Sequence, residues 1–151
     1  MTSQLVESNR TILDSSPLLI SVLIKTYNEE RHIAGAIESA LAGIAPYAGE
    51  VVVADSGSTD ATVAIAQRYP IRVVQLAEAQ DRSCGASAQL AFQHSVGRFV
   101  YLMDGDMVLN AEFVHQAITY LGSHPDVAGV GGSIREMCIV NHEFRRRSSR
   151  R

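Results

Sequence analysis

The residues best suited to chemistry are two aspartates separated by a single glycine, in Asp104-Gly105-Asp106. They follow the apolar run Phe99 to Met103, whose composition predicts a strand buried on both faces. Ligands of open α/β sheets bind just beyond the carboxyl ends of such strands. Two carboxylates this close repel each other unless a cation lies between them. Oxygen ligands of this kind suit Mg²⁺ or Mn²⁺, with a phosphate completing the shell. A plain acidic turn is the alternative, because Asp-Gly is a common turn dipeptide.

Two other polar segments follow predicted strands, so we expect them at the same edge of the sheet. The first is Thr26-Tyr27-Asn28-Glu29, and the second is Asp55-Ser56-Gly57-Ser58. The second segment is a loop of small residues before a helix, where exposed backbone N–H groups can bind an anion or a nucleotide. Simpler interpretations also stand, with Thr26 and Asn28 as helix caps and the second segment as a turn. The three segments together indicate a ligand site more specifically than any one of them does.

The elements that must position these residues follow from the hydrophobic pattern. Apolar, β-branched runs predict strands at 18–24, 50–54, 71–76, 99–104 and, weakened by glycines, 127–134. The pattern predicts a first helix with Ile33, Ile37 and Leu41 on one face, Asn28 as its N-cap, and an end at Gly43 and Pro46. Glu29 and Glu30 are expected to face solvent in its first turn.

Three more helical patterns complete the alternation. They run from Val63 to Gln67, from Ala79 to Ser95 and, after the predicted cap Asn110, from Phe113 to Leu121. Strands alternating with helices predict an α/β fold with right-handed crossovers, in which an open, mostly parallel sheet carries helices on both faces. In this fold Tyr101 and Met103 are expected in the core.

Length and charge indicate one domain with unequal ends. We expect a polar leader at 1–16, one domain at 17–140 and a basic tail at 141–151, where five arginines stand beside one acid. Residues 1–140 hold 15 acidic and 8 basic side chains, which argues against nucleic acid as a partner. The tail could contact an anionic membrane surface peripherally.

The cysteines and the N-terminus indicate the compartment. Cys84 and Cys138 match no metal or redox spacing and suggest free, buried thiols in a reducing environment. The N-terminus shows no secretory signal, and the apolar run 17–24 is too short to span a bilayer. We therefore expect a cytoplasmic location, and membrane association through the basic tail is the alternative.

Other nucleotide-binding patterns are absent from the sequence. No Gly-x-Gly-x-x-Gly follows the first predicted strand, and the chain holds no Walker P-loop. A phosphorelay receiver would place acids at strand ends but would not need the paired Asp-Gly-Asp.

The remaining pattern resembles the inverting family-two nucleotide-sugar glycosyltransferases of GT-A fold. The resemblance covers roughly residues 18–135 and rests on three segments, Ile24-Lys-Thr-Tyr-Asn-Glu-Glu30, Val53-Ala-Asp-Ser-Gly-Ser-Thr-Asp60 and Gly97-Arg-Phe-Val-Tyr-Leu-Met-Asp-Gly-Asp106. It implies a nucleoside-diphosphate sugar, most often a UDP-sugar, as donor and Mg²⁺ or Mn²⁺ as cofactor. It also implies nucleotide-binding roles for Thr26, Tyr27, Asn28, Glu29, Asp55, Ser56 and Asp104. Within that set Asp55 would accept from the base, Asp104 would lie near the ribose, and Asp106, with Asp104 beside it, would bind the metal.

The chain departs from the family pattern in two places. Members often carry Ala-Arg-Asn before the metal motif, where this chain has Ser87-Ala88-Gln89, and Arg82 is the only substitute we suggest. The chain also stops soon after the last predicted strand, so we expect a truncated domain without the acceptor half, inactive alone and prone to self-association. No catalytic base is assigned. A non-catalytic nucleotide-sugar-binding or assembly module and a GT-A-like nucleotidyltransferase stay open as alternatives.

Overall fold

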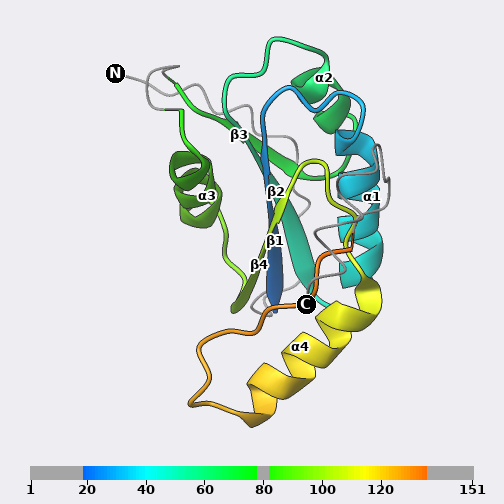
Figure 1. The fold of residues 1–151 in the computed structure, drawn as a ribbon, viewed down its shortest axis with the longest axis vertical. Coiled ribbons are helices and arrows are strands. Elements are labelled where there is room, and N and C mark those ends of the chain that lie inside the picture. The colour runs from blue at the N-terminus through cyan, green and yellow to red at the C-terminus, as the bar shows by residue number, and fades with distance from the viewer. Residues whose placement is uncertain (1–18, 78–81, 136–151) are drawn as a thin grey trace, which may run out of the picture.

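A computed structural model describes residues 19–77 and 82–135 of the chain. Four strands alternate with four helices (Figure 1), in the order β1 (Ile20–Thr26), α1 (Ile33–Ile44), β2 (Gly49–Asp55), α2 (Thr62–Ala66), β3 (Arg72–Gln75), α3 (Cys84–Gln93), β4 (Phe99–Asp104) and α4 (Ala111–Ser123). The predicted leader, the basic tail, Cys138 and residues 79–81 of the predicted third helix lie outside the described residues.

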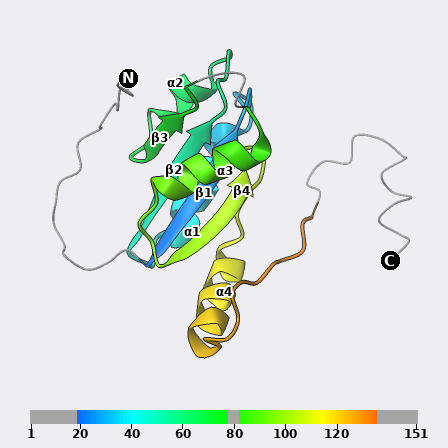
Figure 2. The same cartoon turned by 90° about the vertical axis from the view of Figure 1, so that its left-hand side faces the viewer.

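The strands form one parallel sheet in the order β3-β2-β1-β4. Helix α3 lies across one face of this sheet, while α1, α2 and α4 lie on the other (Figures 1 and 2). The predicted α/β fold, with an open parallel sheet and helices on both faces, is confirmed.

The central strand β1 is the axis of the core. Val22 and Ile24 point to the α1 side, where they pack with Ile33 and Ile37, and all four side chains are fully buried. Leu23 points to the other face and packs with a smaller cluster beneath α3. Because both faces of β1 are covered, its middle residues Val22 to Ile24 are apolar without alternation, as is typical of buried parallel strands.

The prediction that the strand before Asp104 is buried on both faces is wrong. β4 is an edge strand that pairs with β1 alone among the described strands. Met103 is buried and Tyr101 packs against the core as predicted, but Val100 and Leu102 are 42% and 49% exposed. Helix α3 packs on β1, β2 and β3, which leaves this face of β4 open.

The predicted fifth strand at 127–134 is also wrong, because residues 127–135 form neither strand nor helix. Gly129 and Gly131 have no atom within 4 Å of where a side chain would begin. A segment with so few side chains to pack gains little from joining a sheet edge, and glycine loses the most backbone entropy on ordering.

The first helix begins later than predicted. Asn28 does not cap it, because Asn28 adopts a left-handed backbone with φ of +54°, and the N-cap position belongs to His32. Glu29 and Glu30 therefore precede the helix instead of forming its first turn. The cap predicted for α4 is confirmed, since the Asn110 side chain accepts from the Glu112 and Phe113 N–H groups.

Two further findings concern thiols and membranes. Cys84, at the first position of α3, is a free and exposed thiol, so the predicted burial is wrong for this residue. Within residues 19–77 and 82–135, no helix has the length and apolar character needed to cross a bilayer.

Candidate functional site

The three polar segments meet at the carboxyl end of the sheet, as the sequence predicts. Thr26 at the end of β1 is in register with Asp55 at the end of β2. On the other side of β1, Lys25 is in register with Asp104 at the end of β4. The middle strand thus brings all three segments to one edge, where parallel sheets bind ligands.

The loops after β1 and β2 are tied together by hydrogen bonds. The Asn28 side chain accepts from the Thr59 N–H at 2.8 Å, and the Asn28 N–H donates to Ser58 Oγ at 2.8 Å. The Glu29 N–H donates to Thr62 Oγ1 at 2.8 Å, and Glu30 both donates to Asp60 and accepts from the Ala61 N–H. The side-chain oxygen and the N–H of Asn28 thus fix the position of the loop after β1 relative to the loop after β2.

Asp55 is fully buried, and its carboxylate accepts hydrogen bonds from the loop that follows it. The Gly57 and Ser58 N–H groups each donate to Oδ2 at 2.9 Å, Gln75 donates to the same oxygen, and the Ser58 hydroxyl donates to Oδ1. Gly57 sits in the left-handed region at φ of +81°, a conformation that suits glycine. The predicted base contact of Asp55 is untested, and the carboxylate visibly organises this loop.

Arg82 lies at the site, although the sequence suggested it only as a substitute. Its guanidinium carbon is 4.1 Å from the centre of the Tyr27 ring. Its Nε donates to the Ser56 carbonyl at 2.7 Å, and a terminal nitrogen donates to the Gly57 carbonyl. One side chain therefore links the ends of β1 and β2 to the segment before α3. No spacing rule in the sequence could have shown this contact.

Ser56 and Ser87 hold α3 against the second loop. Both are buried, and their hydroxyls are hydrogen-bonded to each other. The Ser56 N–H donates to the Thr26 carbonyl at 2.9 Å. Ser87 stands where the family pattern begins its Ala-Arg-Asn, and here that position makes a packing contact.

Lys25 is a second basic residue at this edge, and its sequence position gave no indication of a role. Its ammonium forms an ion pair with Asp104. The hydrogen bond to Asp104 raises the pKa of Lys25, burial opposes the rise, and the charges of Asp104, Cys84 and Asp106 add to it. Asp106 is exposed and forms no ion pair within the described residues. The two predicted metal ligands are therefore in different electrostatic states.

The turn that carries the two aspartates rests on Thr26. A Cβ on Gly105 would lie 2.8 Å from Thr26 Oγ1, so only glycine lets the turn approach β1 this closely. The Gly105 N–H donates to the Lys25 carbonyl at 2.9 Å. Thr26 Oγ1 is the one buried side-chain polar atom without a hydrogen-bond partner in the described part of the chain. A buried hydroxyl without a partner is costly and calls for an explanation.

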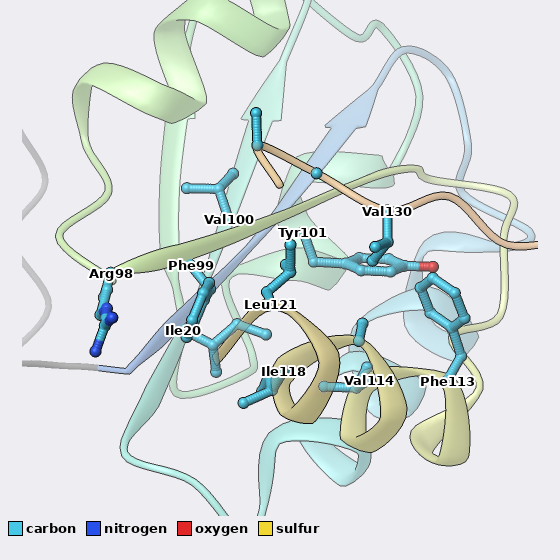
Figure 3. A pocket seen from close by; sticks show the side chains of 13 residues that line it. Ile20, Arg98, Phe99, Val100, Tyr101, Phe113, Val114, Ile118, Leu121 and Val130 are labelled. Atoms are coloured by element: carbon cyan, nitrogen blue, oxygen red, sulfur yellow. The ribbon is translucent and has the colours of Figure 1, made fainter. Parts of the chain in front are cut away.

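A separate hollow lies between β4 and α4 (Figure 3). It measures about 310 Å³ and is lined mainly by apolar side chains, among them Phe99, Tyr101, Phe113 and Ile118. Ile20 and Phe99 mark the amino ends of β1 and β4, so this hollow is at the opposite end from Asp104. Its lining offers no carboxylate, and we assign it no part in the site.

Comparison with known proteins agrees with the fold. The chain is 32% identical over 109 residues to the poly(ribitol-phosphate) beta-N-acetylglucosaminyltransferase TarS of Staphylococcus aureus, covering 69% of this chain and 19% of TarS. The crystal structure of S. aureus TarS with UDP-GlcNAc superimposes with a TM-score of 0.61 at 28% identity, covering 77% of this chain and 37% of that one.

A second solved structure is also similar to this chain. It is glucosyl-3-phosphoglycerate synthase from Mycobacterium tuberculosis with Mn²⁺, UDP-glucose and phosphoglyceric acid, at a TM-score of 0.58 and 30% identity, covering 69% of this chain and 39% of that one. The chain thus spans less than two fifths of each of these relatives. Residues 21–150 match the sequence profile described as Glycosyl transferase family 2. With the matching sheet and the polar strand ends, this places the chain in glycosyl transferase family 2.

Proposed function

We propose that this chain forms the donor-binding part of a metal-dependent glycosyltransferase that uses a nucleoside-diphosphate sugar, with UDP as the favoured nucleotide. The observation that carries the proposal is the Asp104-Gly105-Asp106 turn, held against β1 beside the interlocked loops of β1 and β2. The solved relatives with UDP-GlcNAc and UDP-glucose support the choice of nucleotide.

The chain's own residues fit a divalent metal. Asp106 is exposed and free of ion pairs in the described part, and Asp104 precedes it with Gly105 between them. Their carboxylates suit Mg²⁺ or Mn²⁺, whose remaining positions go to phosphate oxygens and water. The unpaired Thr26 hydroxyl beneath Gly105 marks a polar spot at the same turn. When bound, the metal would stabilise the charge that develops on the departing diphosphate.

The nucleoside is assigned to the other half of the edge. Tyr27 is 42% exposed and carries the Arg82 guanidinium on its ring. An aromatic ring beside a cation offers a stacking surface for a base. Thr26, Asn28, Glu29, Asp55 and Ser56 shape this surface through the hydrogen bonds described above, and their direct contact with nucleotide remains part of the proposal.

Sugar transfer also needs a carboxylate that takes the acceptor's proton. Glu136 and Glu143 lie outside the described residues, and no base is assigned among the others. The sugar and the acceptor stay open, as the relatives named above have different acceptors in their names. We propose a cytoplasmic location, with any membrane contact made through the basic tail.

Calorimetric titration of the protein with UDP, GDP and UTP, with and without Mn²⁺, tests the proposal. We expect UDP to bind more tightly with Mn²⁺, and Asp106→Ala to remove that gain with little change in thermal stability, because an exposed loop acid contributes little to the core. Asp126→Ala, another exposed aspartate, is the matched control.

The other outcomes decide between the alternatives. A preference for UTP would favour a nucleotidyltransferase. Tight UDP-sugar binding without donor consumption is expected both of a donor-binding part and of a non-catalytic binding or assembly module, whereas slow Mn²⁺-dependent hydrolysis of the sugar donor would favour the glycosyltransferase. UDP binding that ignores both Mn²⁺ and Asp106→Ala would contradict the metal site.

A further inference from the structure

Lys25 occupies a position that the proposed function does not yet explain. It is the second-last residue of β1 and stands directly opposite Asp104 in the sheet register. The side chains of Lys25 and Asp104 are 23% and 40% exposed. Their ion pair is therefore at the surface of the edge, where a ligand can reach it.

The alternation of β1 shows which face Lys25 occupies. Leu23 points to the α3 side and packs in the cluster with Ala91 of α3. Side chains two residues apart on a strand share a face, so Lys25 is on the α3 side as well. Arg82, just before α3, donates a hydrogen bond to the Ser56 carbonyl in the loop after β2, the strand next to β1. Lys25 and Arg82 thus both stand at the carboxyl edge of the sheet, and Lys25 is the one that contacts the turn with the two aspartates.

The ion pair has a cost for metal binding. A lysine ammonium that neutralises Asp104 competes with a divalent cation for the same carboxylate, since both charges are positive. Asp106 carries no such partner in the described residues. Asp104 and Asp106 would hold the metal, and the Lys25 ammonium would then lose its partner on Asp104. A diphosphate arriving with the metal brings the anionic oxygens that a flexible lysine binds well.

We propose that Lys25 exchanges partners during donor binding, holding Asp104 in the free protein and the diphosphate oxygens in the donor complex. This inference rests on the proposed donor site. Lys25 would then have two opposite effects: its charge weakens metal binding at Asp104, and it strengthens binding of the diphosphate. In the free protein, Lys25 reduces the repulsion between Asp104 and Asp106 without a metal. In the donor complex, it supplies a cation to the diphosphate leaving group.

The test is a comparison of two affinities in the parent chain and in Lys25→Met. For Mn²⁺ alone, followed by the electron paramagnetic resonance of the free ion, we expect the variant to bind about tenfold more tightly, because a competing charge is gone. For UDP at saturating Mn²⁺, followed by calorimetry, we expect about tenfold weaker binding, because a charged hydrogen bond is lost. A purely structural role would not move the two affinities in opposite directions.

Matched variants exclude simpler explanations. Arg72→Met removes an exposed cation from β3 and should leave both affinities unchanged. Lys25→Arg keeps the charge and should restore most of the UDP affinity. Lys25→Gln supplies a second neutral side chain if Lys25→Met folds poorly.

The outcomes separate this inference from the proposed function. A parent chain that binds no UDP with Mn²⁺ contradicts both. A parent chain that binds UDP, with variants in which both affinities rise, both fall or neither changes, contradicts the exchange alone.

Discussion

At the scale of single residues, three aspartates of one edge are in three different situations. Asp55 is fully buried and accepts hydrogen bonds from its own loop and from Gln75. Asp104 is neutralised by Lys25, while Asp106 is exposed. An aspartate side chain therefore accepts hydrogen bonds from a loop, pairs with a cation or is free to bind a ligand, depending on its surroundings.

Replacing Asp55 by asparagine tests its structural role. The new amide group would face N–H donors where a carboxylate oxygen accepted, so we expect Asp55→Asn to lower the free energy of unfolding by about 1–3 kcal/mol. Urea unfolding measures this, with the exposed Asp126→Asn as control. Unchanged stability together with weaker UDP binding would show instead that the carboxylate serves the nucleotide and not the loop.

The Thr26 hydroxyl gives the opposite prediction. It is buried and has no partner, so a methyl group in its place should cost nothing. We expect Thr26→Val to raise the free energy of unfolding by about 1 kcal/mol and to weaken UDP binding with Mn²⁺. Thermal unfolding and calorimetry measure the two effects, with the exposed Thr119→Val as control. A loss of stability would mean that the hydroxyl is already satisfied.

At the scale of elements, the site depends on how closely β4 approaches β1. Gly97 precedes β4, and a Cβ at this position would lie 2.6 Å from the Ile20 carbonyl carbon and from Ser21 Oγ. The Gly97 N–H also donates to Ser21 Oγ at 2.8 Å. This contact aligns the start of β4 with β1, and the alignment is what brings Asp104 opposite Lys25 at the other end.

Alanine substitutions at two glycines check this view. Gly97→Ala forces a side chain against the β1 backbone, so we expect a loss of about 1–3 kcal/mol in the free energy of unfolding. Gly122→Ala, in α4 with nothing within 4 Å, should instead gain up to about 1 kcal/mol, because alanine is the better helix former. Guanidinium unfolding of both variants provides the comparison, and equal effects would contradict the close contact.

At the scale of the whole molecule, β4 is one of the two edge strands of the sheet that residues 19–77 and 82–135 form. β4 pairs with β1 alone among the described strands, and Val100 and Leu102 are about half exposed on its open face. Sheet edges with apolar side chains favour association with other chains. The hollow of Figure 3 lies beside the same strand.

We therefore expect the 151-residue polypeptide to self-associate through β4. Val100→Thr with Leu102→Thr should reduce association while keeping the strand, since threonine is β-branched and polar. Sedimentation velocity at several concentrations measures the effect. Val108→Thr removes an exposed valine outside the strand and serves as the control. Equal association of all three proteins would rule out β4 as the contact surface.

The sequence by itself determined the alternation of strands and helices and the place of the polar segments at strand ends. Apolar runs such as 18–24 and 50–54 and the Ile33, Ile37 and Leu41 stripe reflect burial that each element needs regardless of its neighbours. It also predicted the Asn110 cap, because a cap acts within four residues.

The tertiary structure alone decided the order of the strands and the partners of the polar groups. The strand before Asp104 was predicted to be buried on both faces because apolar content does not show which neighbours a strand has, and the separately predicted strand at 127–134 does not form. Lys25 with Asp104, Arg82 with Tyr27 and Asn28 with Thr59 join residues that are far apart in the chain. Such contacts arise from the sheet register and the packing of α3, and local sequence patterns carry no information about them.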